Sequence, residues 1–235
     1  MGQTNLDSEM AWYYRERAKI LVANLQKKRL NAQYAANKEE ALKAVVEMVP
    51  PGASIVRGDS ISMNQVGIMA ELRKRGCKVV DPFERDEKGN YIIAEEEKRF
   101  AAAIEAFFAD VFLVGTNAIT IDGKLVNTDG WGNRVAPMIF GPKKVIVVVG
   151  VNKIVKDLDE AFERISQYAA PINARRHFTT LRLSEYGDLP CVKTGRCVDC
   201  NHDMRICHYT TIIDGAMHSE KGRINVVVVG EELGI

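Results

Sequence analysis

Apolar positions in the first fifty residues recur with the period of a helix. From Tyr14 to Leu25 they are spaced four, three and four residues apart, which places them on one face of a helix. A second run, EALKAVVEMV, follows Asn37 and Glu40, whose spacing is typical of an N-cap and its reciprocal partner. This run stops at a Pro-Pro-Gly turn, so the pattern predicts a helical region over residues 1–50.

The pattern then changes to short strands separated by helices. The segment ASIVRG reads as a strand, QVGIMAELRKRG as a helix and CKVVD as a second strand, which indicates a parallel pair. The runs ADVFLVG, KKVIVVVG and INVVVVG are apolar without alternation, which is typical of strands covered on both faces. Helices are predicted in EEEKRFAAAIEAFFA and DLDEAFERISQYAAP. We therefore predict an α/β fold with a mostly parallel sheet and helices on both faces.

Length and punctuation favour a single domain. A chain of 235 residues can bury one large core, and neither a repeat nor a low-complexity linker divides it. We expect one domain over residues 1–235, with a small cysteine-rich C-terminal segment at residues 187–209 as its appendage. Asp122-Gly123 predicts a hairpin turn between AITI and KLVN, and a short helix is expected soon after it.

Charge and hydropathy exclude two classes of partner. Lys and Arg number 32 against 31 Asp and Glu, for a formal charge of +1, and no segment gathers them into a basic stripe. Nucleic acid is therefore not an expected partner. The longest apolar run covers about seven residues, whereas a bilayer-spanning helix needs roughly 20, so no membrane span is expected. Charged residues near the amino terminus do not suit a signal peptide, which predicts a cytoplasmic location.

The polar loop after the first strand of the parallel pair is a candidate binding site. In open parallel sheets, ligands bind beyond the carboxyl ends of the strands. Gly58, Asp59 and Ser60 lie there, where backbone amides at a helix start and a hydroxyl can face a ligand. The carboxylate of Asp59 would repel a bare phosphate. The alternative is that Asp59, Ser60 or Ser62 caps the following helix, and both readings stay open.

A second, longer loop carries more polar groups than a turn needs. Glycines on both sides bring its backbone close to whatever it faces. We expect it to supply a binding site through Thr116, Asn117, Asn127, Asp129, Gly130, Asn133 and Arg134. Lys153 follows the next buried strand, where it either holds an anionic group or is an ordinary surface lysine.

Four cysteines near the C-terminus suggest a metal site. Cys191, Cys197, Cys200 and Cys207 follow the pattern C-x5-C-x2-C-x6-C. Four soft ligands at short separations suit tetrahedral zinc or an iron-sulfur cluster (4Fe-4S). The polar residues between them cannot build a core, so a metal would supply the missing cohesion. Disulfides fit poorly with a cytosolic address, and reduced free thiols remain the alternative.

Four long blocks also match one known family in order: IVRGDSISMNQVGIMAELRKRG, LVGTNAITIDGKLVNTDGWGNRVAPMIFGPKKVIVVVGVNKIV, AAPINARRH and CVKTGRCVDCNHDMRIC. They resemble the LUD-domain family of the lactate-utilization protein C type over nearly the whole chain. This resemblance implies a core similar to those of ribose-phosphate isomerases, glucosamine-phosphate deaminases and CoA transferases. It further implies a part in bacterial oxidation of lactate to pyruvate beside iron-sulfur redox proteins, which favours a cluster over zinc at the cysteines.

Three functions follow from these features. The first is an isomerase- or transferase-like enzyme, or a subunit of a lactate-oxidising system, that binds a small anionic hydroxy acid or sugar-phosphate-like ligand. Asp129 would be its base, Asn127 and Asn133 would hold oxygens, and Lys153 or Arg134 would neutralise charge. The second is a non-catalytic iron-sulfur or zinc subunit of an electron-transfer assembly, and the third is a ligand-sensing module. Trp12, beside two tyrosines, serves either packing or a contact in a homo-oligomer.

Overall fold

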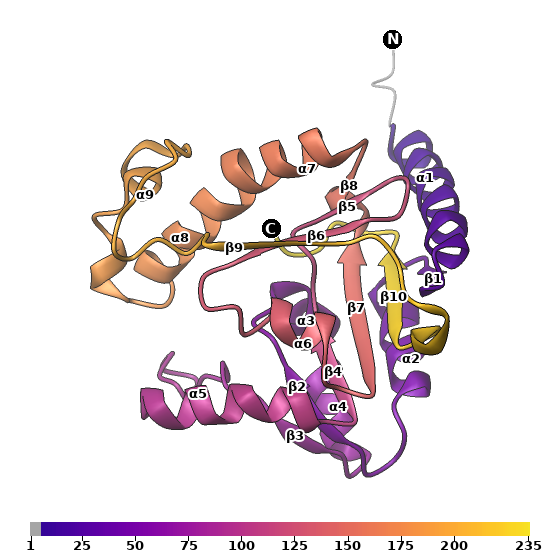
Figure 1. The fold of residues 1–235 in the computed structure, drawn as a ribbon, viewed down its shortest axis with the longest axis horizontal. Helices are drawn as coiled ribbons and strands as arrows, with labels where there is room; N and C mark the ends of the chain where they lie inside the picture. The colour runs from indigo at the N-terminus through magenta and orange to yellow at the C-terminus, as the bar shows by residue number, and fades with distance from the viewer. Residues whose placement is uncertain (1–5) are drawn as a thin grey trace.

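The computed structural model describes residues 6–235 and is built around a six-stranded parallel sheet (Figure 1). Its strands lie in the order β1-β10-β7-β4-β2-β3, and every neighbouring pair runs parallel. The predicted α/β fold is therefore confirmed. The strands are β1 (Asn31–Ala35), β2 (Ser54–Arg57), β3 (Lys78–Val80), β4 (Val111–Val114), β7 (Lys144–Gly150) and β10 (Ile224–Val229).

The central strands are buried on both faces. In β7, Val145 and Val147 belong to one apolar cluster, whereas Ile146 and Val148 belong to the other. This explains why β7 shows no polar alternation in the sequence. One face of the sheet is covered by α2 (Lys38–Met48), α3 (Ile61–Val66) and α4 (Ile68–Lys74). The opposite face is covered by α1 (Asp7–Lys27) together with a second sheet.

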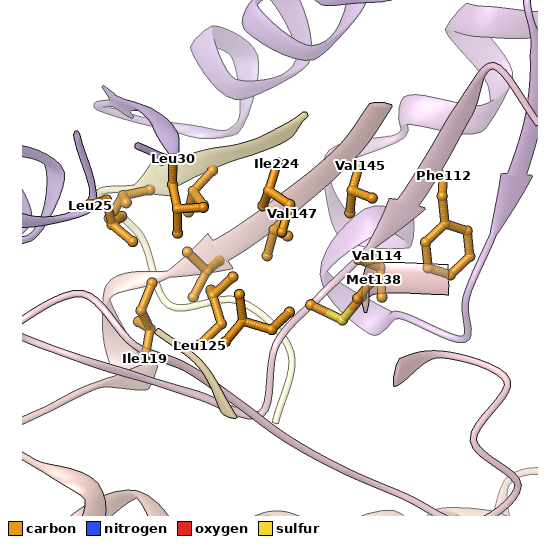
Figure 2. Packing of buried hydrophobic residues seen from close by; sticks show 14 of the residues in the cluster. Leu25, Leu30, Phe112, Val114, Ile119, Leu125, Met138, Val145, Val147 and Ile224 are labelled. Atoms are coloured by element: carbon orange, nitrogen blue, oxygen red, sulfur yellow. The ribbon is translucent and has the colours of Figure 1, made fainter. Parts of the chain in front are cut away.

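This second sheet lies across the first and was only partly predicted. Its strand order is β8-β5-β6-β9, and its β5–β6 pair is the antiparallel hairpin expected at Asp122-Gly123. Ile119 and Leu125 of the hairpin belong to the same core cluster as Val147 of β7 and Leu25 of α1 (Figure 2). The strands are β5 (Ala118–Thr120), β6 (Leu125–Asp129), β8 (Ile154–Val155) and β9 (Tyr209–Ile213).

The predicted N-terminal helical region contains α1 and α2, but also the edge strand β1. Its residues 1–5 lie outside the described part of the chain. The expected helix start is present, because the Glu40 amide donates to Asn37 Oδ1 at 2.9 Å and the Glu40 carboxylate accepts from the Ala36 amide at 2.8 Å. Within residues 6–235, no helix combines the length and the apolar character needed to cross a bilayer.

Two predicted helices differ from a regular α-helix. Gly67, at φ 75°, divides the helix after β2 into α3 and α4. The helix expected to end at Pro171 instead continues through it, as α7 (Leu158–Arg164), η3 (Ile165–Ala169) and α8 (Ala170–Thr179). η3 is a π-helical turn, and its wider backbone accommodates a proline that lacks an N–H group and would crowd the preceding α-turn.

The other helices of the described chain are short. Between β3 and β4, the predicted helix is present as α5 (Glu96–Ile104) and continues as η1 (Glu105–Phe108). The short helix expected after the hairpin is α6 (Val135–Ile139). The remaining elements are η2 (Val151–Lys153), η4 (Ser184–Tyr186), α9 (Pro190–Thr194) and η5 (His218–Glu220).

Candidate functional site

The carboxyl ends of β2 and β4 form a switch point in the sheet. These strands are neighbours in the sheet. The strand that follows β2 in sequence, β3, lies on the far side of β2, whereas the next strand of this sheet after β4, β7, lies on the far side of β4. Loops at such a point separate and leave a crevice in which α/β proteins bind ligands. The loops that begin at Gly58 and Gly115 meet here, and together with the loops after β6 and β7 they enclose a cavity of about 420 Å³.

Most of the predicted site residues line this one cavity. Asp59, from the loop after β2, and Asp129, at the end of β6, both line it. Gly58 and Asn127 lie behind the wall rather than in it. The predicted residues in the wall are Asp59, Ser60, Thr116, Asn117, Asp129, Gly130, Asn133, Arg134 and Lys153.

Gly58 has a steric rather than a ligand-binding position. A Cβ atom there would lie 2.8 Å from Arg134 Cγ and 3.3 Å from side-chain atoms of Phe112 and Val114. A glycine is therefore needed for the Arg134 side chain to pass over the end of β2.

The terminal nitrogens of Arg134 bind amide oxygens rather than a carboxylate. Its Nη1 donates to Asn127 Oδ1 at 3.2 Å, and its Nη2 donates to Asn117 Oδ1 at 3.1 Å and to the Thr128 carbonyl at 2.8 Å. Asn127 is fully buried, and its Nδ2 has no hydrogen-bond partner among the described residues. An unpaired buried donor is costly, and such groups often belong to functional sites.

Lys153 is a buried lysine rather than a surface one. It ends η2 directly after β7, with 6% of its surface exposed, and its Nζ donates to Ser62 Oγ at 3.4 Å. No carboxylate within residues 6–235 forms an ion pair with it. Burial, with added repulsion from Arg164 and Arg134, lowers the pKa of Lys153 to about 7. A substantial fraction of this amine is therefore neutral near pH 7.

Asp129 is anchored by backbone amides. Its Oδ1 accepts from the Gly130 amide at 2.9 Å, and its Oδ2 accepts from the amides of Arg134 at 2.8 Å and Val135 at 3.3 Å. Arg134 Nε is 4.0 Å from the same carboxylate. These bonds fix the start of α6 and the direction of Arg134, and they leave part of the Oδ1 lone-pair capacity for a ligand.

Asp59 and Ser60 join the loop after β2 to neighbouring helices. Asp59 forms an ion pair with Arg176 on α8. Burial works against ionisation of Asp59, but Arg176, with Arg57 behind it, outweighs burial and holds the pKa of the carboxyl below its usual range. Ser60 Oγ accepts from the Met63 amide at 3.4 Å, so Ser60 both caps α3 and lines the cavity.

Sequence reasoning missed the contribution of α8. Asn173, Arg176 and His177 reach the cavity from this helix, and Asn173 Oδ1 accepts from Arg176 Nε at 2.9 Å. His177 Nδ1 is buried and lacks a partner among the described residues. Burial, followed by the charge of Arg176, lowers the pKa of His177 to about 4, so the imidazole is neutral at pH 7. The spacing of three and four residues was visible in the sequence, but not which face the helix turns inward.

The model of the LUD domain family matches residues 18–229, nearly the whole of the described structure. The chain belongs to the LUD domain family. This confirms the resemblance found in the sequence, and membership supports a protein of the lactate-utilization type. No curated protein matches the sequence.

Three solved structures are similar to this LUD domain protein. A DUF162 family protein from Deinococcus radiodurans is 13% identical, with 94% of this chain and 96% of that chain covered and a TM-score of 0.47. Ribose 5-phosphate isomerase from Plasmodium falciparum is 18% identical, with coverages of 51% and 52% and a TM-score of 0.30. Ribose 5 phosphate isomerase A from Neisseria gonorrhoeae is 16% identical, with coverages of 61% and 64% and a TM-score of 0.32.

The cysteine segment of this LUD domain lies beside α8, on the side of the molecule opposite α1 (Figure 1). The four cysteines Cys191, Cys197, Cys200 and Cys207 line a second, small cavity of about 20 Å³. Arg205 holds the loop in place, because its Nη1 donates to the Cys200 carbonyl at 2.6 Å and its Nε donates to the Cys207 carbonyl at 3.0 Å.

The donor set of this cavity fits a metal, although its side chains are not in a ligating arrangement. All four thiols are free, and the Asp199 amide donates to Cys197 Sγ at 3.4 Å. Within residues 6–235, no three His, Cys, Asp or Glu side chains are close enough together to hold an ion. Burial raises the pKa of the Cys191 and Cys207 thiols, and neighbouring cysteines add to it. A metal would therefore have to displace thiol protons as it binds.

The two cavities of the LUD domain share a wall. Ala170, Ile206 and Cys207 line both of them, so the cysteine segment closes one side of the larger cavity. Nothing in the spacing of the cysteines predicted this contact, because it depends on where α8 directs the chain after η3.

Proposed function

We propose that this LUD domain binds a small anionic hydroxy acid or sugar-phosphate-like ligand in the 420 Å³ cavity and contributes to the oxidation of lactate to pyruvate. The observation that carries the proposal is a buried lysine that pairs with no carboxylate of residues 6–235, at the edge of the sheet where ligands bind. A cytoplasmic location belongs to the same proposal, since free thiols persist in reducing compartments.

The proposed roles follow from the contacts of each group. Arg134 supplies a fixed positive charge for the anionic group of the ligand, and Asn117 and Asn127 hold Arg134 in place. Asn133 lines the cavity and can hold a ligand oxygen. Asp129 and Lys153 are the groups proposed to move protons, because each has capacity that its protein contacts do not use.

Substitution of Asp129 by Asn tests this assignment. The change removes the proton acceptor at nearly constant shape, so turnover of small hydroxy acids or phosphorylated sugars should fall about 100-fold or more, as expected for loss of a general base. Turnover is measured on a panel that includes lactate and ribose 5-phosphate, with ligand binding followed by calorimetry. Asp214→Asn, at an exposed carboxylate paired with Lys28 far from the cavity, serves as the matched control. If Asp129→Asn leaves every turnover unchanged, the assignment is wrong.

A non-catalytic subunit of an electron-transfer assembly is the second candidate. It is favoured by the four cysteines around one small cavity, where thiolates would hold either zinc or a 4Fe-4S cluster. A cluster would supply electron transfer to iron-sulfur partner proteins. Trp12 and Tyr13, exposed on α1, offer a surface for a homo-oligomer in either case.

A further inference from the structure

Lys153 differs from the exposed lysines of this chain in the surroundings of its amine. Lys143 pairs with Asp110 at 2.8 Å and Lys38 pairs with Glu231 at 3.1 Å, and both have solvent beside them. Lys153 is buried, and its Nζ donates to the hydroxyl of Ser62 at 3.4 Å. Since no carboxylate in the described part of the chain pairs with it, the amine has no ion pair there to maintain.

The surroundings of Lys153 favour a neutral amine. Arg134 is held by amide and carbonyl oxygens, and Arg164 donates to the carbonyls of Asn117 at 2.7 Å and Asn152 at 3.3 Å. Arginine side chains are not deprotonated in proteins, so protonation of Lys153 would add a third positive charge beside these two guanidiniums. The pKa of about 7 follows from burial first and from these two arginines second. A desolvated lysine beside other cations is a common way to prepare a nitrogen nucleophile.

We propose that Lys153 is a covalent nucleophile that forms an imine with the carbonyl group of a small anionic ligand. The nitrogen lone pair attacks the carbonyl carbon, a C–N bond forms, and the C–O bond then breaks. Both amine protons leave with the oxygen as water, so one water is released for each imine and no oxidant or reductant takes part. The inference rests on the proposed ligand site and narrows the ligands that react there.

The ligand class follows from the two requirements of the cavity. A carbonyl is needed for the imine, and an anionic group is needed for Arg134. Compounds with both are 2-oxo acids and phosphorylated sugars in their open-chain form. Lactate has the anionic group but no ketone or aldehyde carbonyl, so it can bind but cannot form the imine. Pyruvate has both groups and can form it.

Borohydride trapping tests the inference on the full chain. The protein is incubated near neutral pH with pyruvate, with glyceraldehyde 3-phosphate or with lactate, then treated with borohydride and analysed by intact mass and peptide mapping. Reduction of the imine should add the mass of the ligand less one oxygen atom, on the peptide that contains Lys153. Because an exposed lysine is almost fully protonated at this pH, modification of Lys153 should exceed that of other lysines by about tenfold or more. The carbonyl probe that reacts identifies the source.

Two variants complete the experiment. Lys153→Arg keeps a positive charge but cannot form the imine, so the adduct should disappear. Lys156→Arg, at an exposed lysine three residues away, should keep it. The wild-type peptide map is decisive even if the Lys153 variant folds poorly.

Absence of an adduct at Lys153, or equal modification of exposed lysines, overturns the inference. Thermal shifts on the same samples separate this outcome from failure of the proposed function. A probe that binds without an adduct leaves the proposed function standing, whereas neither binding nor adduct contradicts both.

Discussion

Lys153 carries a cost in stability that its place in the cavity explains. Its pKa of about 7 in the folded protein lies below the ordinary 10.5, so between these values the unfolded chain holds a proton that the folded chain has released. Unfolding takes up a proton in this range, and stability therefore rises with pH. The cost of burying the amine is complete below pH 7 and is gone above pH 10.5.

Replacing Lys153 with Met should stabilise the protein in a pH-dependent way. The variant has no charge to desolvate, so we expect a gain of roughly 1 to 4 kcal/mol near pH 6, at about 1.4 kcal/mol for each unit of pKa shift. The gain should shrink as the pH rises toward 10. Urea unfolding at several pH values measures this, with Lys156→Met as the exposed control. A gain that does not vary with pH would mean that Lys153 is not neutral in the folded protein.

At the scale of elements, the sequence predicted the strands that contain an apolar run and missed β1, β8 and β9, whose sequences carry no long run of this kind. The runs of β4, β7 and β10 are apolar throughout because both faces are covered, and this can be read without knowing their neighbours. β1 has the sequence NAQYA and lies at the edge of the sheet, where its pairing with β10 joins Asn31 to Asn225. No local pattern indicates a pairing over such a separation.

The residues of the candidate site also divide into those that the sequence predicted and those that it did not. Asp59 and Asn117 follow the parallel strands β2 and β4, so parallel topology alone predicts that their loops meet at one edge, whereas Asp129 ends β6 of the second sheet. Arg176 and His177 reach the cavity because the helix continues through Pro171 after the π-helical turn η3, and such a turn has no recognisable signature in a single sequence. The burial of Lys153 was likewise hidden, since a lysine after a strand is usually exposed.

The position of Arg134 requires a glycine at Gly58, and a substitution there tests this. In Gly58→Ala the new methyl group would meet Arg134 Cγ, so Arg134 must move and affinity for anionic ligands should fall several-fold. Overpacking of this kind costs about 1 to 3 kcal/mol of stability. Gly52→Ala is a suitable control, because its Cβ meets open space and its positive φ of 73° adds strain away from the cavity. Equal ligand affinity in the two variants would show that Arg134 does not hold the ligand.

On the scale of the whole molecule, the cysteine segment forms part of the wall of the ligand cavity. Met204, Ile206 and Cys207 contribute to the wall of the large cavity, and Ile206 and Cys207 also line the small one. The segment has little apolar area of its own, and Leu189 is its deeply buried apolar side chain. Its cohesion therefore depends on Arg205, on α8 and on whatever the four thiols bind.

If the thiols hold a metal, its removal should loosen the segment and open the ligand cavity. Protein purified without oxygen should contain either one zinc or iron with sulfide, and a structural metal of this kind contributes several kcal/mol or more to folding of its loop, against roughly 10 to 16 kcal/mol for isolated zinc fingers. Cys197→Ser should therefore lower metal content, speed hydrogen exchange over residues 187–209 and weaken ligand binding, while exchange in β7 and β10 stays slow. Cys77→Ala, at a cysteine in the core away from the segment, should keep its metal. Metal-free wild-type protein with an equally protected segment would show that Arg205 and α8 are enough to hold the wall, and that the cysteines serve as free thiols.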